Sequence, residues 1–127
     1  MREMQDQFRV IIAGSRSFSD YGILRSRCNF LFSQKKPTCI LCGEARGADL
    51  LGRRYAEEHG IPVVSYPANW KVYGNRAGYI RNEKMAANAD ALVAFWDGRS
   101  SGTAHMIQLA REYGLSVRVI RFGHAEQ

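Results

Sequence analysis

The chain has 127 residues, of which 46% are hydrophobic, and its 18 lysines and arginines against 12 aspartates and glutamates give a formal charge of +6. This length suits one compact domain, residues 1–127 with a core over about residues 8–122, and no run is apolar enough for a membrane span. The start at 1–7 is too polar for a secretion signal, so we expect a cytoplasmic protein with anionic partners and no membrane partner.

The first half of the chain predicts three strands with a helix between each pair. The first helix begins at Asp20 or Ser19, either of which can cap it, and the second ends at a glycine, Gly60. The strands are expected at 8–13, 38–42 and 62–66.

The second half opens with the longest segment that shows no regular pattern, residues 67–79. A loop of this length in a small domain is more often functional than not, and its aromatic residues Trp70, Tyr73 and Tyr79 could stack a base. A helix then runs from about Arg81 through Ala89. A fourth strand, a last helix and an edge strand are expected at 92–96, 103–113 and 116–122, before a frayed tail.

Regular alternation of strands and helices predicts an α/β fold. We expect a Rossmann-like, three-layer α/β/α arrangement with a five-stranded, mostly parallel sheet in the order 3-2-1-4-5. The first and fourth strands then flank the point where the strand order reverses, and Gly14 and Gly98 face each other across that crevice.

Glycine-containing turns follow the first, second and fourth strands, and we expect them to bind one phosphate-bearing ligand together. Helix N-termini at this edge supply free amides and a positive dipole end, and arginines supply forked contacts to phosphate. The candidate ligand-binding residues are Gly14, Ser15 and Arg16 in the first turn, Gly43, Glu44, Ala45, Arg46, Gly47 and Asp49 in the second, Asn82 on the third helix, and Asp97, Gly98, Ser100, Ser101, Gly102 and Thr103 in the last.

Two further residues are candidates for catalysis. Arg81 opens the third helix and could hold a phosphate, and Glu83 is the nearest general acid or base, although a glutamate there commonly balances the helix dipole. No metal is expected, because Cys39 and Cys42 fall on opposite faces of a strand. No cofactor is expected either, since the glycine turns form neither a P-loop nor a G-x-G-x-x-G motif.

Five motifs together resemble the YspA/YpsA-related branch of the SLOG superfamily, a domain of otherwise unknown function that is common in bacteria and phages. They are VIIAGSR, GEARGAD, PANW, AGYIRNEKMA and the pair FWDG and SGT near residue 100. The resemblance covers about residues 8–120. It implies a Rossmann-like fold, binding or processing of nucleotides and nucleotide-derived ligands, and self-association as a dimer or larger homo-oligomer.

The superfamily includes the Lonely Guy phosphoribohydrolases and the DNA-processing protein DprA. Against the phosphoribohydrolase signature P-G-G-x-G-T-x-x-E, this chain matches the G-T with Gly102 and Thr103, and Arg81 resembles the arginine of the preceding helix. Met106 occupies the glutamate position. Because a thioether cannot protonate a leaving base, a hydrolase here would need Glu83 or Glu44 instead.

Three functions therefore stay open, and the sequence does not decide whether the protein is an enzyme. We favour a domain that binds a nucleotide or nucleotide-derived ligand as a sensor or sequestering protein, because three similar turns recur in one short chain. The second is N-glycosidic hydrolysis of a nucleoside monophosphate. Binding of single-stranded DNA in the manner of DprA comes last, because the basic residues are dispersed along the chain.

Overall fold

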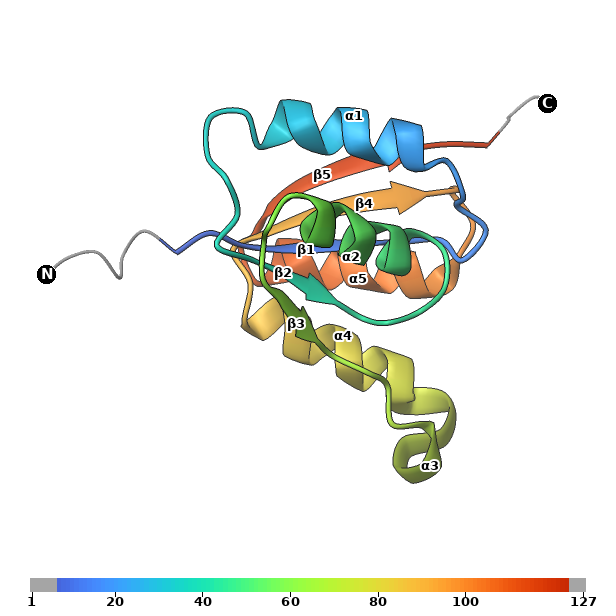
Figure 1. The fold of residues 1–127 in the computed structure, drawn as a ribbon. Coiled ribbons are helices and arrows are strands. Elements are labelled where there is room, and N and C mark those ends of the chain that lie inside the picture. The colour runs from blue at the N-terminus through green and yellow to red at the C-terminus, as the bar shows by residue number, and fades with distance from the viewer. Residues whose placement is uncertain (1–6, 124–127) are drawn as a thin grey trace, which may run out of the picture.

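The computed structural model describes residues 7–123, which alternate between strands and helices along the chain (Figure 1). Its five strands form one sheet in the order β3-β2-β1-β4-β5, and every neighbouring pair is parallel. The predicted α/β class and strand order are confirmed. The strands are β1 (Arg9–Gly14), β2 (Cys39–Cys42), β3 (Val63–Ser65), β4 (Ala91–Trp96) and β5 (Ser116–Arg121). The helices are α1 (Tyr21–Leu31), α2 (Ala48–Glu58), α4 (Ala77–Ala87) and α5 (Ser101–Glu112), with a short α3 (Trp70–Tyr73) and a 3₁₀ turn, η2 (Gly74–Arg76).

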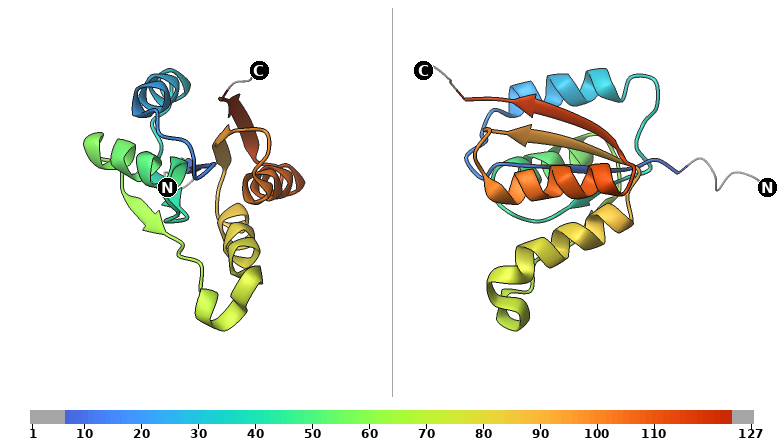
Figure 2. Two further views of the ribbon diagram at one scale, coloured as in Figure 1. Left: turned by 90° about the vertical axis from the view of Figure 1, so that its right-hand side faces the viewer. Right: turned by 180° about the vertical axis from the view of Figure 1, so that it is seen from behind.

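Helices cover both faces of the sheet, which makes the three predicted layers (Figure 2). Helices α1 and α2 lie on one face, around a core that includes Ile12 and Tyr55, and α4 and α5 lie on the other, around Leu92 and Met106. The central strands β1 and β4 are buried on both faces. This explains why they are continuous apolar runs in the sequence and why β5, at an edge, alternates.

The predicted helix ends are also confirmed where they can be compared. Asp20 begins α1 by accepting a hydrogen bond from the Ile23 amide at 3.1 Å, so Asp20 and not Ser19 is the cap. Gly60, at φ +67°, follows the last residues of α2. Apart from the start of α4, the observed bounds differ from the predicted ranges by at most two residues.

The prediction of an irregular loop over 67–79 is wrong. This segment contains α3, η2 and the first turn of α4, and the Asn69 side chain begins α3 by accepting from the Val72 amide at 3.2 Å. No residue of α3 or η2 is buried, so these turns lack the apolar periodicity that identifies a helix in a sequence. We call residues 70–76 the arm, which projects away from the sheet (Figures 1 and 2).

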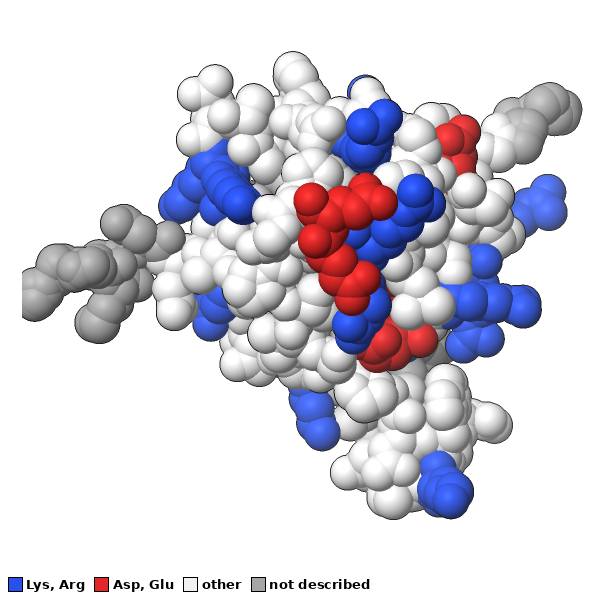
Figure 3. Space-filling view, viewed as in Figure 1, with Lys and Arg blue, Asp and Glu red and all other residues white. Residues whose placement is uncertain are grey.

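Charged side chains are unevenly distributed over the face shown in Figure 3. Acidic side chains gather over α2, where Glu57 and Glu58 pair with Arg53 and Arg54, and basic ones gather at the right, toward which the strands run. Within 7–123, no helix has the length and apolar character needed to cross a bilayer. Most of the polar start and of the predicted frayed tail lies outside the described residues.

Candidate functional site

A cavity of about 590 Å³ opens at the carboxyl ends of the strands, between the turns after β1 and β4 and the arm. Ligands of open parallel sheets bind at this edge, and the volume is typical of small-molecule sites. The predicted residues that line it are Gly14, Ser15, Arg16, Arg46, Asp49, Arg81, Asn82, Asp97, Ser100, Ser101, Gly102 and Thr103. The three turns and the start of α4 therefore meet at one site, although these segments are far apart in the chain.

Hydroxyl groups join the first turn to the last. The Ser15 and Ser100 hydroxyls are 2.8 Å apart, and Ser100 donates to the Thr103 hydroxyl at 3.2 Å. Ser15 also accepts from the Asp97 amide at 3.1 Å. Ser15 and Thr103 are buried, so this network forms a fixed floor at the N-terminus of α5.

Asp97 shapes the last turn with its carboxylate. That group accepts from the amides of Arg99 and Ser100 at 2.8 and 2.9 Å, and these two donors hold the pKa of Asp97 below its ordinary value. The negative charge of Asp97 is therefore stabilised by the amides of its own turn. The side chain of the N-cap residue Ser100 makes no capping hydrogen bond, and residues 101–103, the first turn of α5, line the cavity.

Gly47 lets the second turn lie directly against the first. Its φ is +85°, and a Cβ there would come within 2.5 Å of the Ser15 carbonyl oxygen and 2.6 Å of that of Arg16. The amide of the next residue, Ala48, donates to the same Ser15 oxygen at 3.3 Å. A side chain at position 47 would push the two turns apart, so glycine is required for their contact.

The buried Asp49 and the half-buried Arg81 are charged residues on the β2 side of the cavity. Asp49 is 5% exposed and accepts from the Ala45 amide at 3.3 Å. Burial raises its pKa to about 6, and the positive charge of Arg81 opposes that rise only in part. Burial likewise lowers the pKa of Arg81. A carboxyl with such a pKa can both hold and release a proton near neutral pH.

Hydrogen bonds fix Arg81 in place. Its guanidinium donates to the Gly43 carbonyl oxygen and, at 2.9 Å, to the side-chain oxygen of Asn82. The Asn82 amide nitrogen in turn donates to the Gly102 carbonyl oxygen at 3.2 Å and lies 3.2 Å from Nδ1 of His105. Asn82 therefore ties α4 to the start of α5.

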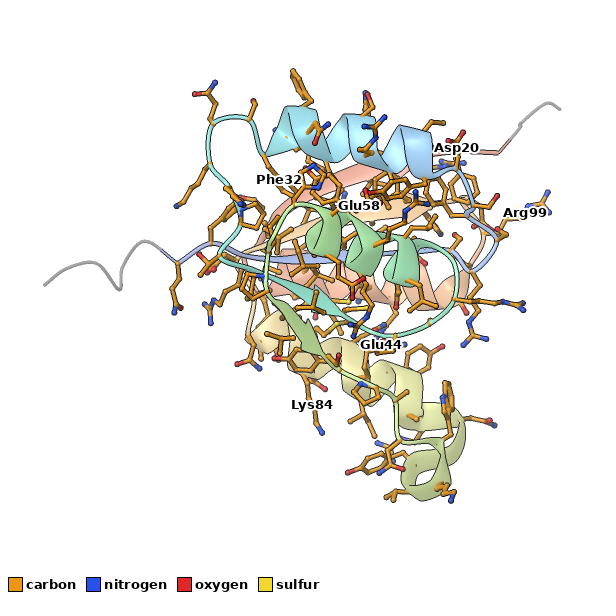
Figure 4. The ribbon with its side chains drawn as sticks, viewed as in Figure 1. Asp20, Phe32, Glu44, Glu58, Lys84 and Arg99 are labelled. Carbon is orange, nitrogen blue, oxygen red and sulfur yellow. The ribbon has the colours of Figure 1, made fainter. Side chains whose placement is uncertain are left out.

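The predicted acids lie elsewhere. Glu83 is exposed on α4, with the Tyr113 hydroxyl 3.5 Å from its carboxylate, and Glu44 pairs with Arg53 and accepts from Ser65 at 2.6 Å. Figure 4 shows Glu44 below α2, and Arg99 projecting away from the body. The predicted site residues that do not line the cavity are Gly43, Glu44, Ala45, Gly47, Gly98 and Glu83.

Of the two glycines expected to face each other across the crevice, Gly14 and Gly98, only one lines the cavity. Gly14 lines it, whereas Gly98 lies against the Arg121 guanidinium. The cavity also includes residues that the sequence did not single out, Asn75, Gly78 and Met85. Asn75 lies in the arm and Gly78 just beyond it, and a helix pattern recognised there would have been the signal for them.

Two of the cysteines, Cys39 and Cys42, belong to β2. Cys42 is buried, and desolvation raises the pKa of its thiol to about 11. Cys39 packs with the core on the opposite face of the sheet. No group of three or more histidine, cysteine or acidic residues in this part of the chain could hold a metal ion.

Comparisons with known proteins agree with this architecture. A model of the YspA, cpYpsA-related SLOG family (YAcAr) matches residues 8–73. The Gene 61 protein of Mycobacterium phage D29 is 35% identical over 122 residues, which covers 91% of this chain and 96% of that protein.

A solved structure is similar in fold. The DNA processing protein A (DprA) from Streptococcus pneumoniae superposes with a TM-score of 0.69 at 17% identity, over 92% of this chain and 51% of the DprA chain. This chain thus spans about half the length of DprA, and at that identity the likeness concerns the fold alone.

Proposed function

The chain belongs to the YspA, cpYpsA-related SLOG family, and from that premise we propose that it binds a nucleotide or nucleotide-derived phosphorylated ligand in the cavity at the carboxyl ends of the strands. The observation that carries this proposal is the convergence of the turns after β1, β2 and β4 on one cavity. Their combination of amides, hydroxyls and arginines suits an anion.

The charges around the cavity support a phosphate over a neutral ligand. Arg16 and Arg46 line the cavity, and their side chains are exposed. Of the carboxylates that line it, Asp97 is bound to backbone amides, and Asp49 is buried with a raised pKa. Two guanidinium groups at the rim are therefore available for forked contacts to phosphate.

Calorimetric titration tests this proposal with AMP, ADP, ADP-ribose and cyclic dinucleotides. We expect at least one to bind, and Arg16→Ala or Arg46→Ala to weaken it by about 10- to 150-fold, the usual effect of losing a charged hydrogen bond. Arg27→Ala is the matched control, because it removes the same charge from the exposed surface of α1. The proposal would be refuted if the wild type bound none of these ligands, or if Arg27→Ala weakened binding as much as Arg16→Ala and Arg46→Ala do.

A second candidate function, hydrolysis of the N-glycosidic bond of a nucleoside monophosphate, is favoured by Asp49. Its carboxyl lies in the cavity beside Arg81 with a pKa of about 6, whereas Glu83 and Glu44 do not line the cavity. In this reaction Asp49 would give its proton to the base as the bond to C1′ breaks. Water would then add its hydroxyl to C1′ and return its proton to Asp49.

Chromatography of the products formed from AMP decides this second candidate. A hydrolase would release adenine and ribose 5-phosphate, Asp49→Asn would abolish the release, and the exposed Glu83→Gln would preserve it. If the wild-type protein leaves AMP intact, this second candidate is refuted for AMP.

A further inference from the structure

The arm exposes an unusual amount of aromatic surface for its size. Trp70 and Tyr73 are 51% and 43% exposed, Val72 between them is 66% exposed, and Tyr79 just beyond the arm is 47% exposed. None of the residues in α3 or η2 is buried, so these rings do not stabilise a core. Exposed apolar surface of this kind usually marks a binding site.

Two of these rings, Trp70 and Tyr79, line the cavity, and we call them the aromatic wall. Other walls of the same cavity include the polar residues Ser15, Thr103 and Arg16. The cavity thus has an anion-binding part and an aromatic part. A ligand that uses both must carry a negative charge and a planar, apolar group.

Contacts with neighbouring residues hold the aromatic wall in position. The Trp70 ring lies 3.6 Å from where a Cβ of Gly78 would stand, so the ring packs directly over the backbone of α4. The Tyr79 ring lies 4.5 Å from the His105 ring, at 59° to it. His105 in turn contacts Asn82, which joins α4 to α5. Both rings are therefore presented before any ligand arrives, which lowers the entropy lost on binding.

We propose that the aromatic wall is the base subsite of the cavity, so that the protein selects nucleotides over sugar phosphates of equal charge. This inference rests on the proposed function and adds the part of the ligand that is recognised apart from its phosphate. Stacking on Trp70 accepts the face of any base, so the subsite distinguishes a base from no base more strongly than one base from another.

The test compares AMP with ribose 5-phosphate, which keeps the phosphate and sugar but has no base. By calorimetry we expect the wild type to bind AMP about 5- to 140-fold more tightly, the range typical of one base stacked on an aromatic ring. Trp70→Ala should bring that ratio close to one without changing the affinity for ribose 5-phosphate. Trp70→Phe, which restores a ring, should recover most of the ratio.

Tyr73→Ala is the matched control, because Tyr73 is another exposed ring of the arm and does not line the cavity. It should leave both affinities unchanged. AMP should also quench the tryptophan fluorescence of the wild type, and it should cause far less quenching in Trp70→Phe.

The outcomes separate this inference from the proposed function. If both ligands bind equally well, or if Trp70→Ala keeps the wild-type ratio, the base subsite is refuted while the phosphate site stands. If neither ligand binds, the proposed function and the base subsite fail together. If Tyr73→Ala lowers the ratio of the two affinities as much as Trp70→Ala does, the effect belongs to the fold of the arm, and the inference is also overturned.

Discussion

Asp49 carries a buried carboxyl group whose ionisation the folded protein disfavours. Its pKa rises from an ordinary 3.8 to about 6, chiefly because burial removes water from the charged form. Between these values the folded protein keeps a proton that the unfolded chain releases. The contribution of Asp49 to stability should therefore be largest below pH 4, fall as the pH rises through 6, and stay level above it, with a total loss of roughly 3 kcal/mol.

Asp49→Asn should remove this dependence, because an amide does not titrate and can still accept from the Ala45 amide. Relative to the wild type, the free energy of unfolding of the variant should rise by roughly 2 kcal/mol between pH 4.5 and pH 7.5. Urea unfolding at both pH values measures this difference. A difference that is the same at both pH values would mean that Asp49 titrates as it does in the unfolded chain.

The sequence placed the turn residues at the cavity more accurately than it placed the candidate general acids, Glu83 and Glu44. Glycine, serine and arginine after a strand mark the turn directly, so Ser15, Arg16 and Thr103 could be assigned to the edge where the cavity opens without knowing any helix orientation. Glu83 required that orientation. Residues two apart on a helix do not face the same way, and Arg81 is the one that lines the cavity. Asp49 could be placed near the site, but its raised pKa depends on a burial that sequence spacing does not reveal.

At the scale of elements, the position of α2 depends on its close approach to β1. Gly52 lies in the middle of α2, and a Cβ there would come within 2.6 Å of the Ile12 side chain. The helix can rest on the strand only because this position has no side chain. The second turn, which precedes α2, is thereby held against the cavity.

We expect Gly52→Ala to lower the free energy of unfolding by about 1–3 kcal/mol, because an added methyl group must displace the tightly packed Ile12. Gly22→Ala, in the first turn of α1, meets only the Asp20 side chain at 3.4 Å. It should raise stability by up to about 1 kcal/mol through helix propensity alone. Urea unfolding of both variants gives the comparison, and a gain in stability for Gly52→Ala would contradict the close packing of α2 on β1.

The arm shows which elements a sequence predicts poorly. Strands β1 and β4 and helix α5 pack against the hydrophobic core. Their sequences therefore show a continuous apolar run in the strands and apolar residues at helical spacing in the helix. Helix α3 has no buried face and only four residues, and its helical start is visible only in the Asn69 cap. The loop predicted at 67–79 was therefore wrong in structure. Of its aromatic residues, which the sequence suggests could stack a base, Trp70 and Tyr79 line the cavity and Tyr73 does not.

At the scale of the whole molecule, the parallel sheet accounts for the site. Because every strand runs in the same direction, all the turns that follow the strands open on one edge, and the order 3-2-1-4-5 brings those after β1 and β4 together. The three-layer, mostly parallel arrangement followed from the alternation of elements and the right-handed crossover rule. The chemical identity of the proposed ligand did not, because the amides and arginines of the turns favour anions in general, while the aromatic wall comes from a segment without a sequence pattern.

The most direct test of the account is a titration of the isotopically labelled protein with AMP, followed through its backbone amide and indole NMR signals. We expect the largest shifts at Ser15, Arg16, Arg46 and the first turn of α5, together with the Trp70 indole. Signals on α1, across the sheet from α4 and α5, should stay in place. Shifts confined to α1, or no shift at millimolar AMP, would contradict the claim that the three turns bind a nucleotide together.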